Sequence, residues 1–97
     1  MKYSELSKKA SIALINAYDE ITNRMVEKDP DTECVKNDIK KNFLSLMLPN
    51  FALTFAMTVV FEKMDISDEE IEEKLVAFTN EYKKSFEKEL ISEGIQL

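Results

Sequence analysis

The chain has 97 residues, 44% of them hydrophobic and 33% charged, and its 13 Lys and Arg against 19 Asp and Glu give a net charge of −6. This length predicts a single domain spanning residues 1–97, and the composition excludes an intrinsically disordered chain. One Gly and two Pro supply few turns, which disfavours a many-stranded sheet and favours a few long helices.

Cysteine content indicates the compartment. Cys34 is the only cysteine, so an intrachain disulfide is excluded and a reducing cytoplasm is the expected location. The first ten residues, MKYSELSKKA, lack the apolar core of a signal peptide.

A first helix is expected over residues 4–28, with Ser4 as its N-terminal cap. Its apolar side chains recur at steps of three and four, the spacing of one helical face. This stripe consists of Leu6, Ala10, Ala13 or Leu14, Ala17 or Tyr18, Ile21 and Met25.

A second helix is expected over residues 30–48. Asp29 is a suitable N-cap, and Pro30 suits the first helical position, where the missing N–H is not needed. Pro49 is expected to end this helix, because its ring clashes with the carbonyl of Ser45.

The next stretch must be hidden from water. Residues 42–61 form a run of twenty residues without a charge, and fourteen of them are apolar. A third helix over residues 50–64 is therefore predicted at the centre of the fold, with Phe51, Phe55, Val59 and Phe61 buried. Such a run is also long enough to span a bilayer, but Pro49 divides it into two pieces that are each too short. A buried central helix is the preferred interpretation, and a membrane span is the alternative.

A fourth helix is expected over residues 68–93. Ser67 and Glu70 have the spacing of a capping box, and Ile66 and Ile71 that of a hydrophobic staple. Gly94 is placed to end the helix in a left-handed conformation. The sequence thus predicts an all-α domain of four helices, 4–28, 30–48, 50–64 and 68–93, around an apolar third helix.

The last helix is predicted to be longer than the middle helices and carries apolar residues near its C-terminal end. We therefore expect these side chains to lack cover within the chain and to form a two-fold contact with a second copy. The predicted self-association residues are Tyr82, Phe86, Leu90 and Ile91.

The start of the last helix is strongly acidic. Residues 65–97 contain four Lys and ten Asp or Glu, whereas residues 1–64 contain nine of each sign, so the net charge lies in the last third. Acidic residues in a first turn favour the helix dipole, which explains part of this run without any function. A dense negative patch also attracts basic partners. The predicted partner-binding residues are Asp65, Asp68, Glu69, Glu72 and Glu73.

Catalytic and cofactor signatures are not found. The absence of histidine excludes Ser-His-Asp and Cys-His catalysis and most zinc sites, and one glycine excludes a phosphate-binding loop. The acidic run lacks the spacing of a calcium-binding EF-hand. We therefore assign no catalytic, cofactor-binding or metal-binding residue, and an enzyme is not expected. The lysines are scattered and the net charge has the wrong sign for phosphate, so direct nucleic-acid binding is not expected either.

Residues 52–78, ALTFAMTVVFEKMDISDEEIEEKLVAF, resemble a segment of small helical proteins from phages and mobile elements of Gram-positive bacteria. In those proteins an apolar helix precedes a basic turn and a long amphipathic helix, whereas the turn here is acidic. The resemblance covers under a third of the chain and implies a phage setting, in which many small acidic proteins inhibit host proteins, including defence nucleases.

Together these observations predict a non-catalytic protein-binding module, an inhibitor or adaptor with a basic host protein as its partner. The alternative is a homodimeric structural or regulatory protein whose acidic face only keeps it soluble.

Overall fold

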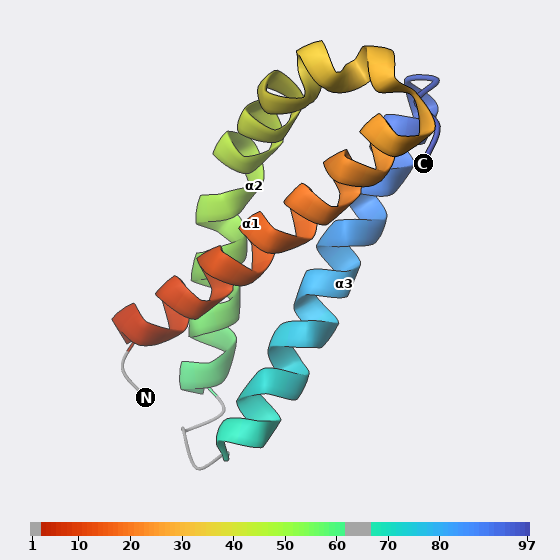
Figure 1. Ribbon diagram of the computed structural model, residues 1–97. Helices are drawn as coiled ribbons and strands as arrows, with labels where there is room; N and C mark the ends of the chain where they lie inside the picture. Colours follow the sequence, from red (N-terminus) through yellow and green to blue (C-terminus); the bar gives the residue numbers. More distant parts are fainter. Residues whose placement is uncertain (1–2, 62–66) are drawn as a thin grey trace.

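Three long helices pack against one another in a bundle, and α1 runs diagonally in front of the other two in Figure 1. They are α1 (Tyr3–Lys28), α2 (Glu33–Phe61) and α3 (Asp68–Ser92), and a short 3-10 helix, η1 (Pro30–Thr32), connects α1 to α2. This computed structural model describes residues 3–61 and 67–97, with the side chains of residues 4–60 and 67–97. The all-α domain measures 48 × 20 × 18 Å along its principal axes.

The predicted apolar stripe of α1 forms one side of the core. Spacing of three and four residues places these side chains on a single helical face, and that face packs on α2 and α3. The buried residues of α1 are Leu6, Ala10, Leu14, Ala17, Tyr18, Ile21, Thr22 and Met25. Thr22 is the polar member, and its hydroxyl donates to the Tyr18 carbonyl at 2.9 Å.

The turn between α1 and α2 follows the sequence signals. Asp29 has an extended backbone, and its side chain accepts a hydrogen bond from the Asp31 N–H at 3.1 Å, so it caps the 3-10 helix as predicted. Pro30 occupies the first helical position, where no N–H is required. Helical structure therefore begins at Pro30, as the sequence indicated, but residues 30–32 form a 3-10 turn and α2 itself begins at Glu33.

The predicted separation of a second helix (30–48) from a third (50–64) is wrong, because α2 runs without interruption from Glu33 to Phe61 with Pro49 inside it. The described chain therefore has three long helices, the middle one long and apolar. Both Pro49 and Ser45 are exposed, so the proline and the residue whose carbonyl loses its helical partner lie on the outside of the fold. An interior proline costs about 3 kcal/mol, whereas burying one large apolar side chain contributes roughly 1.5–3 kcal/mol. Phe51, Phe55 and Val59 are all fully buried, as predicted, and they offset that cost. The side chain of Phe61, predicted to be buried with them, lies outside the described residues.

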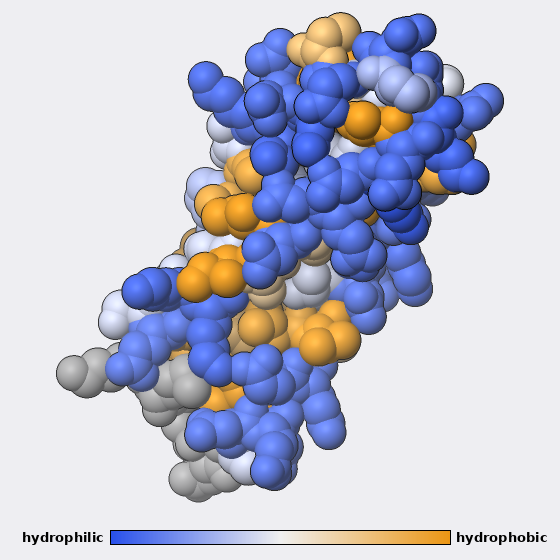
Figure 2. Space-filling view, in the orientation of Figure 1, coloured by the Kyte–Doolittle hydropathy of each residue, from blue (hydrophilic) through white to orange (hydrophobic). Residues whose placement is uncertain are grey.

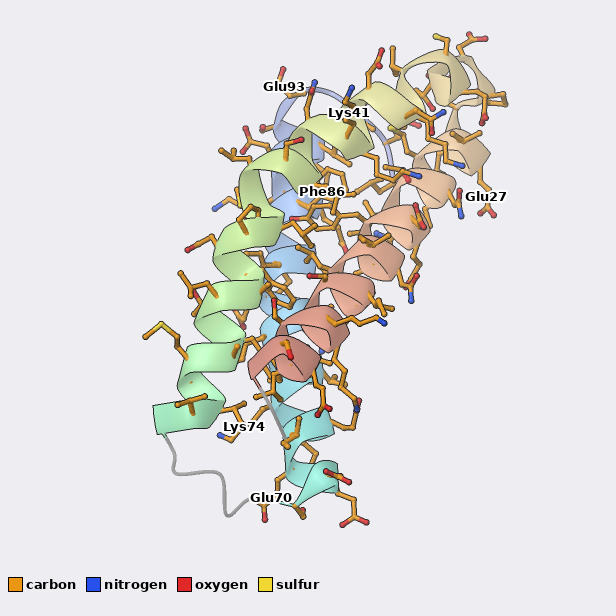
Figure 3. The ribbon with its side chains drawn as sticks, turned by 90° about the vertical axis from the view of Figure 1, so that its left-hand side faces the viewer. Glu27, Lys41, Glu70, Lys74, Phe86 and Glu93 are labelled. Atoms are coloured by element: carbon orange, nitrogen blue, oxygen red, sulfur yellow. The ribbon has the colours of Figure 1, made fainter. Side chains whose placement is uncertain are left out.

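The middle helix is curved rather than straight. In Figures 1 and 3 the first turns of α2 lie across one end of the bundle, and its later turns run beside α1 and α3. The curve carries Phe43 over the C-terminal half of α3, where its ring centroid lies 4.6 Å from that of Phe86.

Both ends of α3 have the predicted local chemistry. The Glu70 N–H donates to the Ser67 hydroxyl at 3.2 Å, and Ile71 is buried behind this cap. The predicted staple partner, Ile66, lies outside the described residues. At the other end Gly94 has φ 86°, and the Ile95 N–H donates back to the Leu90 carbonyl at 3.0 Å, which is a Schellman motif. This turn directs Ile95 and Leu97 onto the core.

Candidate protein-interaction surfaces

The acidic start of α3 presents its carboxylates to solvent. Four of the five predicted partner-binding residues are described, and all four are exposed: Asp68, Glu69, Glu72 and Glu73. The fifth, Asp65, lies outside the described residues. Ile71 and Leu75 occupy the opposite side of the same turns and are buried. The helix thus separates its apolar anchors from its carboxylates, and the outward side of its first two turns is negatively charged.

One carboxylate of this surface is paired within the molecule. Lys9 of α1 forms an ion pair and hydrogen bond with Glu72. The hydrogen bond that Lys9 donates to Glu72, together with the charges of Glu72 and Asp68, raises the pKa of Lys9 above its ordinary value. Both side chains are about half exposed, so the pair adds little stability, but it neutralises part of the patch. The negative charge available to a partner therefore centres on Asp68, Glu69 and Glu73.

The predicted self-association residues are mostly covered within the chain. Phe86 is only 1% exposed and Leu90 only 2%, so the premise that they lack cover is wrong. Phe86 lies between Tyr18 of α1 and Phe43 of α2, with ring centroids 4.2 and 4.6 Å away. Figure 3 shows Phe86 pointing into the space between the helices. The cause is the curve of α2, which brings its first half to the end of α3.

Tyr82 and Ile91 differ from this pair. Tyr82 is half-buried against Phe51, with ring centroids 4.7 Å apart, and its hydroxyl accepts a hydrogen bond from the Asn50 amide at 3.3 Å. Ile91 is 59% exposed and is the one predicted self-association residue that faces solvent freely. The predicted surface is therefore reduced to a single apolar side chain, which is ordinary for a protein surface.

A different apolar surface lies on the outer side of α2. Leu46, Leu53, Met57 and Val60 are 69%, 48%, 39% and 43% exposed, and we call these four residues the α2 outer stripe. Hydrophobic side chains in Figure 2 are few on a mostly hydrophilic face, and several lie toward the edge along which α2 runs. This surface does not follow from the sequence, because Asn50, Thr54 and Thr58 mark one narrow polar edge and the remaining sides of the stretch are apolar, so its periodicity does not separate an inner from an outer face.

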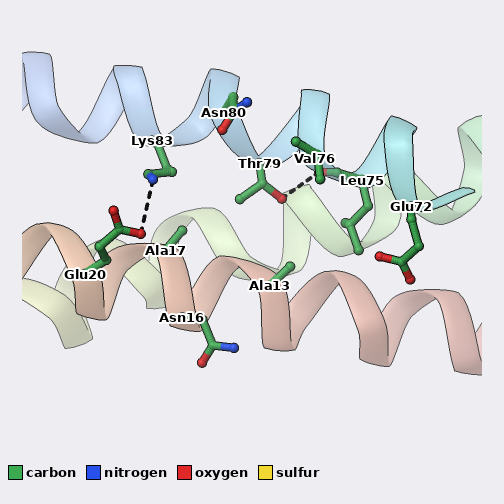
Figure 4. A pocket seen from close by; sticks show the side chains of 10 residues that line it. All are labelled: Ala13, Asn16, Ala17, Glu20, Glu72, Leu75, Val76, Thr79, Asn80 and Lys83. Atoms are coloured by element: carbon green, nitrogen blue, oxygen red, sulfur yellow. Dashed lines mark hydrogen bonds and ion pairs between the residues drawn. The ribbon is translucent and has the colours of Figure 1, made fainter.

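A shallow groove runs between α1 and α3 (Figure 4). Its volume is about 290 Å³, and Ala13 and Ala17 line it from α1 opposite Leu75 and Thr79 of α3. At one end Lys83 of α3 reaches across to Glu20 of α1, with Nζ 3.3 Å from Oε2. The Thr79 hydroxyl is used by its own helix, because it donates to the Leu75 carbonyl at 2.7 Å. The groove thus offers small apolar walls and an ion pair, without a nucleophile and base in contact.

Among the side chains of residues 4–60 and 67–97, no group of three His, Cys, Asp or Glu could hold a metal ion. Cys34 is exposed, and its Sγ lies 3.3 Å from the Asp31 carbonyl.

By length and composition alone, residues 30–60 could cross a membrane, and 28% of the most apolar part of this span is buried in the fold. Comparison with protein-family models, with curated proteins and with solved structures gave no match for this chain.

Proposed function

We propose that this chain is a non-catalytic, cytoplasmic protein-binding module that offers the acidic start of α3 to a basic surface of a host protein. The observation that carries the proposal is the exposure of Asp68, Glu69 and Glu73 on the side of α3 away from its buried anchors. The fold itself needs little from these carboxylates, since Ser67 caps the helix and Ile71 and Leu75 hold it in place.

The position of the patch suits recognition by charge. In Figure 3 Glu70 marks one end of α3 and Glu93 the other, so the acidic turns lie at one end of an elongated molecule. Clustered charge of one sign raises the rate at which an oppositely charged partner is captured. The net charge of −6 repels phosphate, so the basic partner in this proposal is a protein, for example one whose own surface grips nucleic acid.

The biological setting in this proposal rests on the resemblance of residues 52–78 to small helical proteins of mobile elements. In that setting the module acts as an inhibitor or adaptor. A defence nuclease fits as the host partner, because its basic nucleic-acid-binding surface would attract the acidic start of α3. The alternative is a homodimeric structural or regulatory protein, which the exposed α2 outer stripe favours.

The test compares two variants that each lose three carboxylates from α3. In the first, Glu69, Glu72 and Glu73 are changed to Gln; in the control, Glu81, Glu89 and Glu93 are changed to Gln. All six residues are exposed, so the free energy of unfolding should shift by less than about 0.5 kcal/mol per substitution in either variant.

A partner captured from host lysate is then used to measure association rates at low and high salt. The first variant should associate more slowly than the control and the wild type, and the difference should shrink at high salt, because steering by charge is screened. Equal association rates for the two variants at low salt would show that the acidic start of α3 only solubilises and caps the helix, and would favour the alternative, a structural or regulatory protein with no inhibitory role.

A further inference from the structure

In the second half of α2, a row of apolar residues lies on the outer side as well as on the side that faces the core. Phe51, Phe55 and Val59 point inward and are fully buried, while Leu53, Met57 and Val60 lie on the opposite side and are 39–48% exposed. A helix that is apolar on all sides normally has all sides covered. The other large exposed apolar residues of α1 and α3, Ile12, Val76 and Ile91, are isolated from one another in the sequence and form no such row.

We propose that a second copy of this chain covers the α2 outer stripe, through an antiparallel two-fold contact between the two α2 helices. The spacing of the stripe supports a helical partner of the same kind. Leu46, Leu53, Met57 and Val60 follow one another at steps of seven, four and three residues, which fits a coiled-coil seam. The intervening seam position is Asn50, whose amide donates to the Tyr82 hydroxyl of α3. A second α2 presents the same pattern and is therefore complementary to it.

The absence of charged residues on this face also favours contact with a second copy. Residues 42–61 contain no charged residue, whereas the whole chain carries −6. Two copies can thus meet along this face without opposing their carboxylates. A lipid surface fits less well, because no Lys or Arg within residues 42–61 can meet anionic headgroups, and because the acidic turns of α3 carry Asp68, Glu69 and Glu73.

The direction of packing follows from the same charges. The acidic start of α3 lies at the end of the bundle where α2 finishes (Figure 1). Parallel packing would place two acidic starts side by side, and antiparallel packing separates them to opposite ends. Leu53 is the middle of the stripe, so antiparallel packing puts the two copies of Leu53 against each other at the two-fold axis and puts Leu46 opposite Val60 of the other copy.

The first experiment is sedimentation equilibrium at micromolar concentration. The wild type should sediment as a dimer, and Leu53→Lys should raise the dissociation constant by about tenfold or more, because it buries a charge at the centre of the contact. Ile91→Lys is the control, because Ile91 is similarly exposed but lies on α3; it should leave the dimer unchanged. Circular dichroism verifies that both variants are folded. A monomeric wild type, or a dimer that Leu53→Lys leaves intact, would overturn the proposal.

The second experiment tests direction by disulfide formation, in a background in which Cys34 is replaced by Ser. Leu53→Cys should crosslink with itself, Val60→Cys should not, and a mixture of Leu46→Cys with Val60→Cys should crosslink. Self-crosslinking of Val60→Cys would contradict antiparallel packing. Co-sedimentation of the wild type with anionic or neutral vesicles, abolished by Leu53→Lys, would instead assign the stripe to a lipid surface and overturn the proposal.

Discussion

Phe55 shows what holds the fold together at the scale of a single residue. It is fully buried, and its ring packs edge-on against Phe78 of α3 with centroids 5.8 Å apart. Phe55→Ala should lower the free energy of unfolding by about 3–5 kcal/mol, the usual cost of deleting a large core side chain. The matched control is Leu53→Ala, two residues away on the opposite side of α2. Urea unfolding of the two variants at a concentration where both are monomeric measures the difference. Equal losses of unfolding free energy would contradict the assignment of Phe55 to the buried face of α2 and of Leu53 to its exposed face.

Tyr18 gives the fold a dependence on alkaline pH. It is 1% exposed, and burial raises its pKa to about 12, with a smaller contribution from Tyr82. An unfolded tyrosine ionises near pH 10. Between these two values the unfolded state loses a proton that the folded state keeps. The contribution of Tyr18 to the free energy of unfolding is therefore fully present below about pH 10, and it falls by roughly 1.4 kcal/mol per pH unit as pH rises toward 12.

The variant Tyr18→Phe isolates this contribution, because phenylalanine does not ionise. The free energy of unfolding of the wild type minus that of the variant, measured at pH 8, 10 and 11, should fall as pH rises. Only the wild type loses stability when Tyr18 ionises in the unfolded state. A constant difference across this range would contradict a raised pKa for the Tyr18 hydroxyl.

At the scale of elements, the end of α3 depends on a backbone conformation that favours glycine. Gly94 has φ 86°, and no heavy atom lies within 4 Å of a Cβ placed there, so the cost of a side chain is conformational rather than steric crowding. Gly94→Ala should destabilise the protein by about 1–2 kcal/mol, the penalty for an L-residue in the left-handed region. Gly94→Asn should cost less, because asparagine tolerates this region better. Thermal unfolding of the three proteins gives the ranking, and an alanine variant as stable as the wild type would show that the Schellman turn is not required.

The helices differ in how far their sequences determine them. The stripe of α1, the Asp29 and Ser67 caps and the Gly94 turn follow from local spacing and hydrogen bonding, and they could be predicted. The continuity of α2 through Pro49 could not be predicted. The free-energy cost of an interior proline is local, whereas the gain from burying Phe51 and Phe55 depends on how the other helices pack against them. The cover of Phe86 depends in turn on the curve of α2, which brings Phe43 from a distant part of the chain.

The candidate surfaces differ in the same way. Exposure of Glu69, Glu72 and Glu73 could be predicted, because Ile71 and Leu75 fix which side of α3 is inside. The α2 outer stripe could not, because apart from the polar edge of Asn50, Thr54 and Thr58 the stretch is apolar, and its periodicity does not choose among the remaining sides. The pairing of Lys9 with Glu72 joins residues 63 positions apart, and only the packing of α1 on α3 brings them together.

At the scale of the whole molecule, the question is whether the uncharged residues 42–61 form the inner layer of a water-soluble domain or a membrane span. Length and composition allow both. The structure buries Phe51, Phe55 and Val59 against the other helices, and a lipid-spanning α2 would have to release them. The interaction surfaces proposed for α2 and α3 both require the soluble form.

The most direct measurement is ultracentrifugation of cells expressing the wild-type chain, lysed without detergent and divided into membrane and soluble fractions. We predict that the protein remains in the supernatant, and that the purified protein is helical and unfolds cooperatively in detergent-free buffer. Recovery in the membrane pellet, with release by detergent but not by high salt or alkaline carbonate, would contradict this structure of α2 and both proposals built on it.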